Sequence, residues 1–348
     1  MIRLPGLIDP HVHLRDPGQT DKEDFLSGSS AALAGGFTTI IDMPNNINPV
    51  ITEKILEEKI NVAKQKIVCD VGFHFGSLGQ KFEEFKTIQS KVLGLKIYLN
   101  QTTGNYIVDE NVFKNICKAW PQDRPILVHA EENVLEAILE IGNTSGQKIH
   151  VCHVSSAKEL GIIIKAKEKG FSVTCGVTAH HLFLNSDDEK KLGALGKMKP
   201  SLKSKEDVNF IWENLNSIDI IESDHAPHKL EEKKSNNPPY GVPGLETTLP
   251  LLLTAMSDGR ITLENIRRLC HDNAAKTFGI KTNPNTFIEI DEAEEWTIKN
   301  EDLFTKCKWS PFNGWKVTGK VKRVTIRGTK VFEDGKILVK PGFGKIIS

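Results

Sequence analysis

The chain has 348 residues, of which 39% are hydrophobic and 26% are charged, as in an ordinary soluble globular protein. Its 45 basic and 45 acidic side chains cancel, so the composition gives no indication of a nucleic acid or an anionic membrane as partner. It has no run of about 18 apolar residues, so no transmembrane helix is predicted. The length suits one large domain with an accessory unit, or two ordinary domains.

The N-terminus and the cysteines indicate the cellular compartment of the protein. The first residues lack the basic and apolar segments of a signal peptide, and the six cysteines show no CxxC spacing. We therefore expect no disulfide framework and a reducing, cytoplasmic compartment. Because the first predicted strand begins almost at residue 1, we also expect the chain to be a piece of a longer polypeptide.

The apolar run at residues 4–8 predicts a short buried strand, and His11 and His13 follow it. Side chains two apart on an extended segment point the same way, so these two imidazoles converge. Imidazole nitrogen is a common ligand for zinc and similar ions. An arbitrary HxH is more often a pair of surface histidines, but the apolar run before it and Asp9 and Arg15 around it favour a metal site.

Short β-branched segments then alternate with helical patterns over about 220 residues. After the first strand, the predicted strands are 37–42, 69–75, 95–99, 126–129, 149–153, 171–177 and 218–223. The helices predicted between them include 22–34, 52–66, 109–120, 132–142, 156–169 and 205–214. Eight strands that alternate with helices predict an α/β fold of the (β/α)8 or TIM barrel type.

The pattern changes after residue 224. Helices are expected at 247–256, 262–269 and 273–278, and short strands at 287–290, 296–298, 321–327, 330–332 and 337–339. We therefore expect a barrel over residues 1–284 and a small β-rich C-terminal subdomain over residues 285–348. This subdomain would pack on the barrel, with the first few residues of the chain as a candidate partner strand.

Polar side chains gather at the predicted strand ends, where barrels of this class carry their chemistry. They are His11 and His13 after the first strand, Asn45 after the second, Lys96 in the fourth, His129 and His153 at the ends of the fifth and sixth, and Asp224 after the last. Each alone has a structural explanation, such as a hydrogen-bonded core histidine or a helix cap. Five metal-type ligands on four strand ends together favour a metal centre.

Lys96 lies between Leu95 and Ile97 in a predicted buried strand, where an unpaired ammonium is costly. One explanation is a buried salt bridge with Asp42 or Asp224. The other is that the neutral amine has added carbon dioxide to form a carbamate, whose two oxygens can bridge two cations. The metal-type ligands around it favour the carbamate.

Seven segments carry a resemblance to a known family. They are residues 11–18 (HVHLRDPG), 43–45 (MPN), 94–100 (GLKIYLN), 128–131 (VHAE), 152–155 (CHVS), 178–182 (TAHHL) and 223–228 (SDHAPH). With them the whole chain resembles dihydroorotase, of the amidohydrolase superfamily. Residues 295–298 (EWTI) and 309–314 (WSPFNG) resemble the subgroup fused to carbamoyl-phosphate synthetase and aspartate transcarbamoylase in pyrimidine synthesis.

The resemblance implies an amidohydrolase-type barrel that cyclises N-carbamoyl-L-aspartate reversibly to (S)-dihydroorotate. It also implies two zinc ions per chain, bridged by a hydroxide, with Asp224 as the proton carrier. The implied metal ligands are His11, His13 and Asp224 for one ion, His129 and His153 for the other, and carboxylated Lys96 as a second bridge.

The resemblance also implies how the substrate is held. The implied contacts are Arg15, Asn45 and His228 for the free carboxylate, Lys199 and Tyr240 for the ring, and Thr102, which would close over the substrate from a mobile loop at residues 100–106. The planar donor fork of an arginine suits a carboxylate. Thr103 stands where the fusion-type loop usually has an aromatic residue, so we expect its closure to be organised differently.

Gly176 is a second departure, since the family often has Cys-Glu-Val where this chain has Cys-Gly-Val. The family glutamate, with Cys152 and His11, has been associated with a third zinc ion. Because glycine offers no ligand atom, we expect no stoichiometric third zinc and interpret Cys152 as an ordinary buried thiol. We also expect Gly176→Glu to be tolerated if the backbone there does not need positive φ.

Two other functions stay open. Another cyclic amidase, such as a hydantoinase or an allantoinase, would share the barrel, the HxH and the lysine, although Arg15 and Asn45 favour a substrate with a free carboxylate. The second is a silent dihydroorotase-like scaffold domain, but such relatives typically lose metal ligands and all six are present here. The expected partners are a small-molecule substrate, a second copy in a homodimer, and the two fused or associated enzymes.

Overall fold

The protein was analysed as a computed structural model, which describes residues 1–101 and 106–348. Its main sheet has eight parallel strands that are neighbours in chain order, confirming the predicted (β/α)8 barrel. They are β2 (Leu7–Val12), β3 (Phe37–Asp42), β4 (Asp70–Gly76), β5 (Gly94–Tyr98), β6 (Ile126–His129), β7 (Ile149–Val151), β8 (Val173–Thr178) and β9 (Ile220–Glu222). A parallel bridge between Val12 and His225 brings the two edges of the sheet together.

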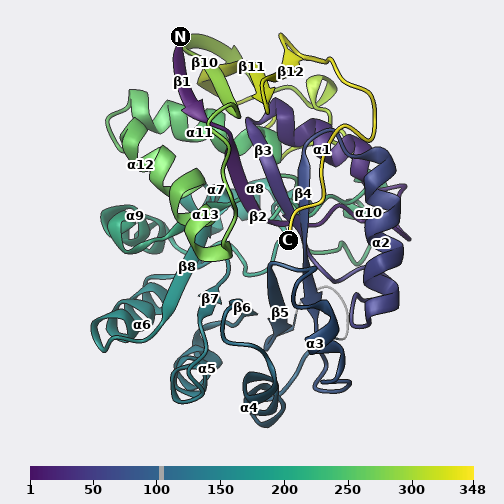
Figure 1. The fold of residues 1–348 in the computed structure, drawn as a ribbon. Helices are drawn as coiled ribbons and strands as arrows, with labels where there is room; N and C mark the ends of the chain where they lie inside the picture. Colours follow the sequence, from purple (N-terminus) through teal and green to yellow (C-terminus); the bar gives the residue numbers. More distant parts are fainter. Residues whose placement is uncertain (102–105) are drawn as a thin grey trace.

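Helices surround the strands, as Figure 1 shows. Those that follow the barrel strands are α1 (Phe25–Ala34), α2 (Glu53–Lys66), α3 (Glu84–Ile88), α4 (Glu110–Ala119), α5 (Glu132–Thr144), α6 (Ala157–Glu168), α9 (Lys205–Glu213) and, after β9, α11 (Leu245–Ser257), α12 (Leu263–Arg267) and α13 (Asn273–Phe278). Side-chain caps begin many of them, and the Thr52 hydroxyl accepts the amide of Ile55 at the start of α2, as predicted.

Several short elements are absent from the sequence-based prediction. They are α7 (Ala179–Phe183), α8 (Ser186–Leu192), α10 (Leu230–Lys233), the 3-10 turns Gly193–Gly196, Leu215–Ser217 and Asn300–Asp302, and the π turn Arg268–Asp272. Each is too short for an apolar period to be recognised in the sequence. None of the described helices is both long and apolar enough to span a bilayer.

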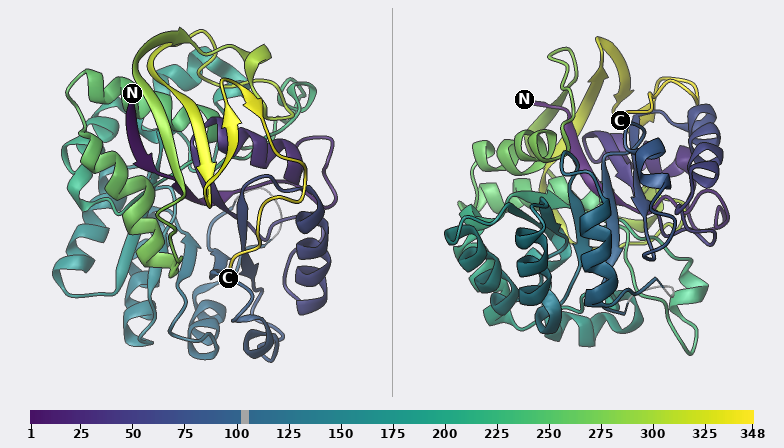
Figure 2. Two further views of the ribbon diagram at one scale, coloured as in Figure 1. Left: turned by 45° about the horizontal axis from the view of Figure 1, so that its top comes forward. Right: turned by 60° about the horizontal axis from the view of Figure 1, so that its bottom comes forward.

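A second, antiparallel sheet lies against the barrel (Figure 2). Its order is β1-β10-β11-β12-β13, with the strands β1 (Ile2–Pro5), β10 (Phe287–Thr297), β11 (Lys316–Ile326), β12 (Thr329–Glu333) and β13 (Lys336–Ile337). The first residues of the chain therefore do share a sheet with the C-terminal strands. The strands predicted at 287–290 and 296–298 form one strand, because an irregular register between Asp291 and Glu295 interrupts the alternation without ending the pairing.

The strand predicted at residues 4–8 is two strands in two sheets, and Gly6 separates them. A Cβ at Gly6 would lie 2.2 Å from the Thr38 hydroxyl, so only glycine fits where the chain passes from one sheet to the other. At the other end, Ile346 forms a parallel bridge with Val71 of β4. A domain boundary at 284/285 stays a prediction.

Candidate metal centre and substrate pocket

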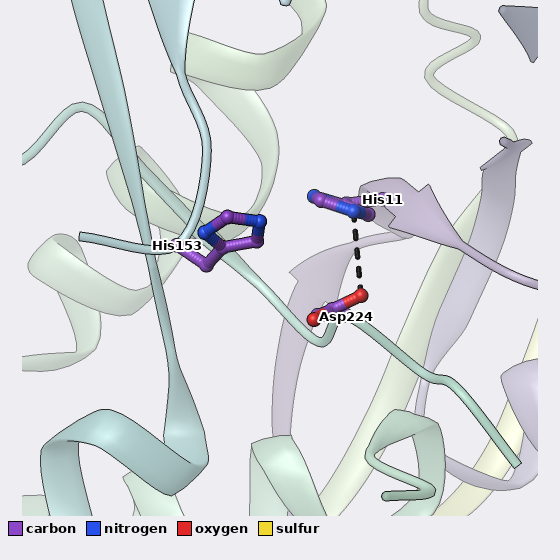
Figure 3. A group of neighbouring side chains, drawn as sticks. All are labelled: His11, His153 and Asp224. Atoms are coloured by element: carbon purple, nitrogen blue, oxygen red, sulfur yellow. Dashed lines mark ion pairs between the residues drawn. The ribbon is translucent and has the colours of Figure 1, made fainter. Parts of the chain in front are cut away.

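Five of the predicted metal ligands come together at the C-terminal mouth of the barrel. His11 Nε2 and His13 Nε2 lie 3.3 and 3.0 Å from the same Asp224 oxygen. His129 Nδ1 lies 3.0 Å from His153 Nε2. Figure 3 shows that His11, His153 and Asp224 point toward one another from three segments of the chain. The two groups correspond to the two sets of ligands that the resemblance implies.

Unusual backbone conformations direct three side chains at the mouth, two of which are metal-ligand candidates. Arg15, His153 and Asp224 have φ angles of 62°, 38° and 44°, in the left-handed region that non-glycine residues rarely adopt. Each such residue costs about 1–3 kcal/mol and persists only where its surroundings enforce it. The residue types give only a weak signal of this, because aspartate and histidine adopt this region more often than most residues but arginine does not. Left-handed residues at the strand ends turn the chain sharply at the mouth.

Several buried ring nitrogens of the cluster make no hydrogen bond among the described residues, including His129 Nε2 and His153 Nδ1. Burial lowers the pKa of His13 to about 4 and that of His129 to about 3, so both are neutral at pH 7 with a lone pair available. Neutral imidazoles beside a carboxylate are a suitable donor set for a divalent metal ion. The atoms of His11, His153 and Asp224 that could bind one lie within 4.8 Å of one another.

The pKa of His11 is raised, whereas those of His13 and His129 are lowered. Burial alone would lower its pKa, but the Asp224 and Glu222 carboxylates outweigh burial and raise it to about 10. The pKa of Asp224 is in turn held well below its usual range, because the His11 and His13 imidazoles outweigh the opposing effect of burial. Without a metal ion, His11 therefore carries a proton that metal binding would displace.

Lys96 is 1% exposed, and its ammonium donates to the Cys152 sulfur at 3.1 Å. Within the described ranges, no carboxylate lies at ion-pair distance from it. The salt-bridge explanation is wrong for Asp42, which pairs with Lys59 at 2.8 Å, and for Asp224, which pairs with the histidines. The ammonium also lies 5.0 Å from the centre of the Tyr98 ring. A buried ammonium whose contacts among the described residues are a thiol and an aromatic ring is costly, so this environment fits a modified lysine better than a free amine.

The substrate-binding candidates line the same cavity. Its walls carry the four histidines and Asp224 together with Arg15, Asn45, Lys199 and Tyr240. Arg15 is 5% exposed, and its Nε donates to the Pro227 carbonyl at 3.2 Å. His228 is not among the lining residues. It lies behind Arg15, 3.2 Å from its guanidinium, and donates to the Tyr240 carbonyl.

Comparisons with known proteins identify the family. A sequence profile described as "Amidohydrolase family" matches residues 2–331. The chain belongs to the amidohydrolase family. The "Multifunctional protein CAD" of Squalus acanthias is 46% identical over 99% of the chain, which spans only 16% of that protein. The "Dihydroorotase" of Pyrococcus furiosus is 38% identical over 99% of the chain and 84% of its own length. The resemblance to dihydroorotase is therefore confirmed.

Solved structures of the amidohydrolase fold agree closely with this one. "L-Hydantoinase (Dihydropyrimidinase) from Arthrobacter aurescens" has a TM-score of 0.92 at 27% identity, covering 99% of this chain and 88% of that one. The "Inactive dihydroorotase-like domain of Chaetomium thermophilum CAD-like multifunctional protein" has a TM-score of 0.86 at 27% identity, covering 100% and 99%. Because the names of these neighbours differ in activity, the fold does not decide the function and the site residues must.

The sequence-based interpretation missed Glu222, the last residue of β9. A Cβ at Gly176 would lie 2.6–2.8 Å from its carboxyl group, so the carboxylate occupies the space of a side chain at 176. His11, Cys152 and Glu222 have potential ligand atoms within 4.8 Å of one another. A carboxylate therefore does lie beside Cys152, supplied from position 222 and not from 176, and the absence of a third zinc stays a prediction. A glutamate at 176 would have to displace the Glu222 carboxylate, so its tolerance depends on this contact as well as on φ and also stays a prediction. A glutamate in an apolar strand just before the SDHAPH motif was the available signal.

Thr102 lies outside the described residues, as do positions 103–105, so the predicted closure over the substrate has no structural counterpart here. The flanking Tyr106 is described, and its hydroxyl donates to the Asn46 carbonyl at 2.9 Å. Asn46 follows Asn45 directly, so this end of the loop is fixed beside the cavity.

Proposed function

We propose that the chain is a dihydroorotase, which interconverts N-carbamoyl-L-aspartate and (S)-dihydroorotate in pyrimidine biosynthesis. The observation that carries the proposal is the buried Arg15 guanidinium in the cavity that also holds the four histidines. A planar cation there suits a cyclic amide with a free carboxylate, which dihydroorotate has and hydantoin lacks. The identity to a dihydroorotase over 84% of its length supports this choice of substrate.

The centre would hold two zinc ions. His11, His13 and Asp224 would hold one, His129 and His153 the other, and carboxylated Lys96 would bridge them. The unpartnered ring nitrogens and the lack of a carboxylate at Lys96 among the described residues support this assignment. When bound, zinc polarises a substrate carbonyl and lowers the pKa of a bound water.

The residues of the chain would supply binding and proton transfer. Arg15 and Asn45 would hold the substrate carboxylate, with His228 beside the Arg15 guanidinium and Thr102 covering the substrate. In ring opening, a water attacks the ring carbonyl carbon, the carbon–nitrogen bond breaks, and Asp224 carries a proton from the water to the departing nitrogen. Ring closure reverses these steps. The depressed pKa of Asp224 leaves it ionised to accept the proton.

The test is an assay of the zinc-loaded protein with dihydroorotate, hydantoin and allantoin. We expect turnover of dihydroorotate and little of the other two. Turnover of hydantoin without dihydroorotate would show a different cyclic amidase. A protein with full metal content but no turnover would show the silent scaffold, for which the inactive structural neighbour is the precedent.

The proposal also covers the oligomeric state, the compartment and the fusion partners of the enzyme. We expect a homodimer in the cytoplasm, fused to or associated with carbamoyl-phosphate synthetase and aspartate transcarbamoylase. The match to a protein named as multifunctional, of which the chain spans 16%, supports the fusion.

A further inference from the structure

The Glu222 carboxylate contacts both halves of the histidine cluster, and the mechanism above does not use it. It is completely buried at the end of β9. One oxygen accepts the backbone N–H of His153 at 2.6 Å and lies 3.3 Å from His11 Nδ1. The other oxygen lies 3.4 Å from His150 Nε2. We propose that Glu222 is a positioning residue that holds His11 and His153 in the geometry for metal binding. The inference rests on the proposed metal centre.

The first part of this role concerns the His11 ring. Nδ1 faces Glu222 and Nε2 faces Asp224, each at 3.3 Å, so the imidazole lies between the two carboxylates at ion-pair distance. An ionised carboxylate only accepts, and therefore favours the form of His11 that carries its proton on Nδ1 and presents Nε2 to a metal ion. Such outer partners of metal-binding histidines typically change metal affinity about 10–100-fold.

The second part concerns the backbone of His153, whose φ of 38° is strained. The strong bond from its N–H to Glu222 is the kind of contact that can hold such a residue in place. The adjacent Val154 amide is also fixed, because it donates to the Gly176 carbonyl at 2.8 Å. Together these bonds hold the His153 ring 3.0 Å from His129.

Gly176 explains how the carboxylate reaches this position. Gly176 pairs with Ile220 on the adjacent strands β8 and β9, and Glu222 reaches across toward β7 over the space that the glycine leaves open. Any side chain at 176 would compete with Glu222 for this space. The Glu222 carboxylate therefore depends on the glycine at 176. A glutamate at 176 could hold His11 and His153 in its place only if the Glu222 side chain were shortened.

The test measures zinc content per chain after dialysis against increasing chelator concentrations, without substrate. We expect Glu222→Gln to lose zinc at a chelator concentration about 10–100-fold lower than the wild-type chain. The matched control is Glu246→Gln, which alters another buried carboxylate, one that accepts the amides of Phe304 and Thr305, and should retain zinc normally. Gly176→Glu combined with Glu222→Ala should recover most of the loss, whereas Gly176→Glu alone should not behave as wild type.

Two outcomes would overturn the role of Glu222. One is Glu222→Gln retaining zinc as the wild-type chain does. The other is an equal loss of one zinc in Glu222→Gln and Cys152→Ala, because Glu222 would then be a metal ligand. If Glu222→Gln does not fold, Glu222→Asp replaces it with the same expected direction, since it keeps the charge but withdraws the carboxyl group. A wild-type chain that binds no zinc would instead refute the proposed metal centre, which is a distinct result.

Discussion

Buried lysines have different hydrogen-bond partners in two regions of this molecule. Beside the mouth, Lys59 pairs with Asp42 and also donates to the Met43 carbonyl and to Asn46, and Lys233 donates to three backbone carbonyls at 2.9–3.0 Å. Inside the mouth, Lys96 has a thiol for its hydrogen-bond partner and several imidazole nitrogens make no hydrogen bond among the described residues.

The difference between the two regions indicates where the chemistry lies. Buried polar atoms in folded proteins are nearly always satisfied, so a cluster of unsatisfied ones indicates a missing partner. Beside the mouth, the fold supplies the hydrogen-bond partners of the buried Lys59 and Lys233 ammonium groups. In the mouth, the proposed zinc ions and a carboxylated Lys96 would supply the missing partners. Substitutions in both regions can test this contrast.

Removal of the Lys96 side chain should have the largest effect. Lys96→Ala should lower turnover of dihydroorotate by about 10,000-fold or more and reduce bound zinc, because the bridge between the ions is lost. Added short carboxylic acids should restore part of the activity, since they can supply a bridging carboxylate. Activity assays and metal analysis of the same samples measure both effects. Full activity in Lys96→Ala would refute the carbamate.

The second prediction compares lysines in the metal-free protein. Lys59→Met should lower the free energy of unfolding by about 3–5 kcal/mol, because it leaves a buried Asp42 without its partner. Lys96→Met should be neutral or stabilising, because it removes a buried ammonium that has no carboxylate at ion-pair distance among the described residues. Denaturant unfolding of both variants measures the difference. Equal destabilisation would contradict the contrast between the two regions.

Asp224→Asn should lower the rates of ring opening and ring closure by about 100–10,000-fold, since an amide can neither accept nor donate the transferred proton. Ring closure consumes one proton, so the equilibrium itself should move about tenfold per pH unit toward the ring as pH falls. Rates in both directions and zinc content measure the effect. If Asp224→Asn kept more than a few per cent of activity with its metal ions bound, Asp224 would be only a ligand.

Arg15→Met should lower kcat/KM for dihydroorotate by about 10–100-fold, the value of about one charged hydrogen bond. Most of the effect should be in KM, because the substrate carboxylate is not the reacting group. Lys199→Ala is the matched control, since it removes a cation from the same cavity while keeping the backbone that would contact the ring. Equal losses in the two variants would mean that net charge, and not the planar fork, selects the substrate.

The last effect, on stability and not on activity, concerns the buried carboxyl group of Glu246. Burial raises its pKa to about 7 from 4.5, so the folded state binds this proton more tightly than the unfolded chain does. Its contribution to stability is therefore present below pH about 4.5 and is lost as pH rises toward 7, by at most about 1.4 kcal/mol per pH unit. Glu246→Gln should remove this slope from unfolding free energies measured across that interval. An unchanged slope would contradict the assignment.

Much of the barrel could be predicted from the sequence, because its strands are short β-branched runs between helical periods. The predicted 37–42 and 126–129 coincide with β3 and β6. The separation of β1 from β2 could not be predicted, since it depends on the approach of Thr38 to Gly6 from a distant part of the chain. The small helices and the continuity of β10 were missed for the same reason, that tertiary contacts decide them.

The residues of the site also divide into those that could be predicted from the sequence and those that could not. Its histidines, Asp224 and Lys96 could be named because they stand in short motifs at strand ends. Glu222 could not be placed by examining position 176 alone, because its carboxylate reaches the site from the neighbouring strand β9. The positive φ angles of Arg15 and His153 also leave no trace in composition or spacing. The register of neighbouring strands decides which side chains share a space, and the sequence alone does not reveal that register.

The number of zinc ions bound per chain decides whether the mouth is a binuclear metal centre. We expect about two in the purified, zinc-loaded wild-type protein, measured by elemental analysis against protein concentration, because His11 and His13 with Asp224, and His129 with His153, are the two proposed sets of ligands. A chain that binds no zinc, or only one ion, with all of these residues in place would contradict it.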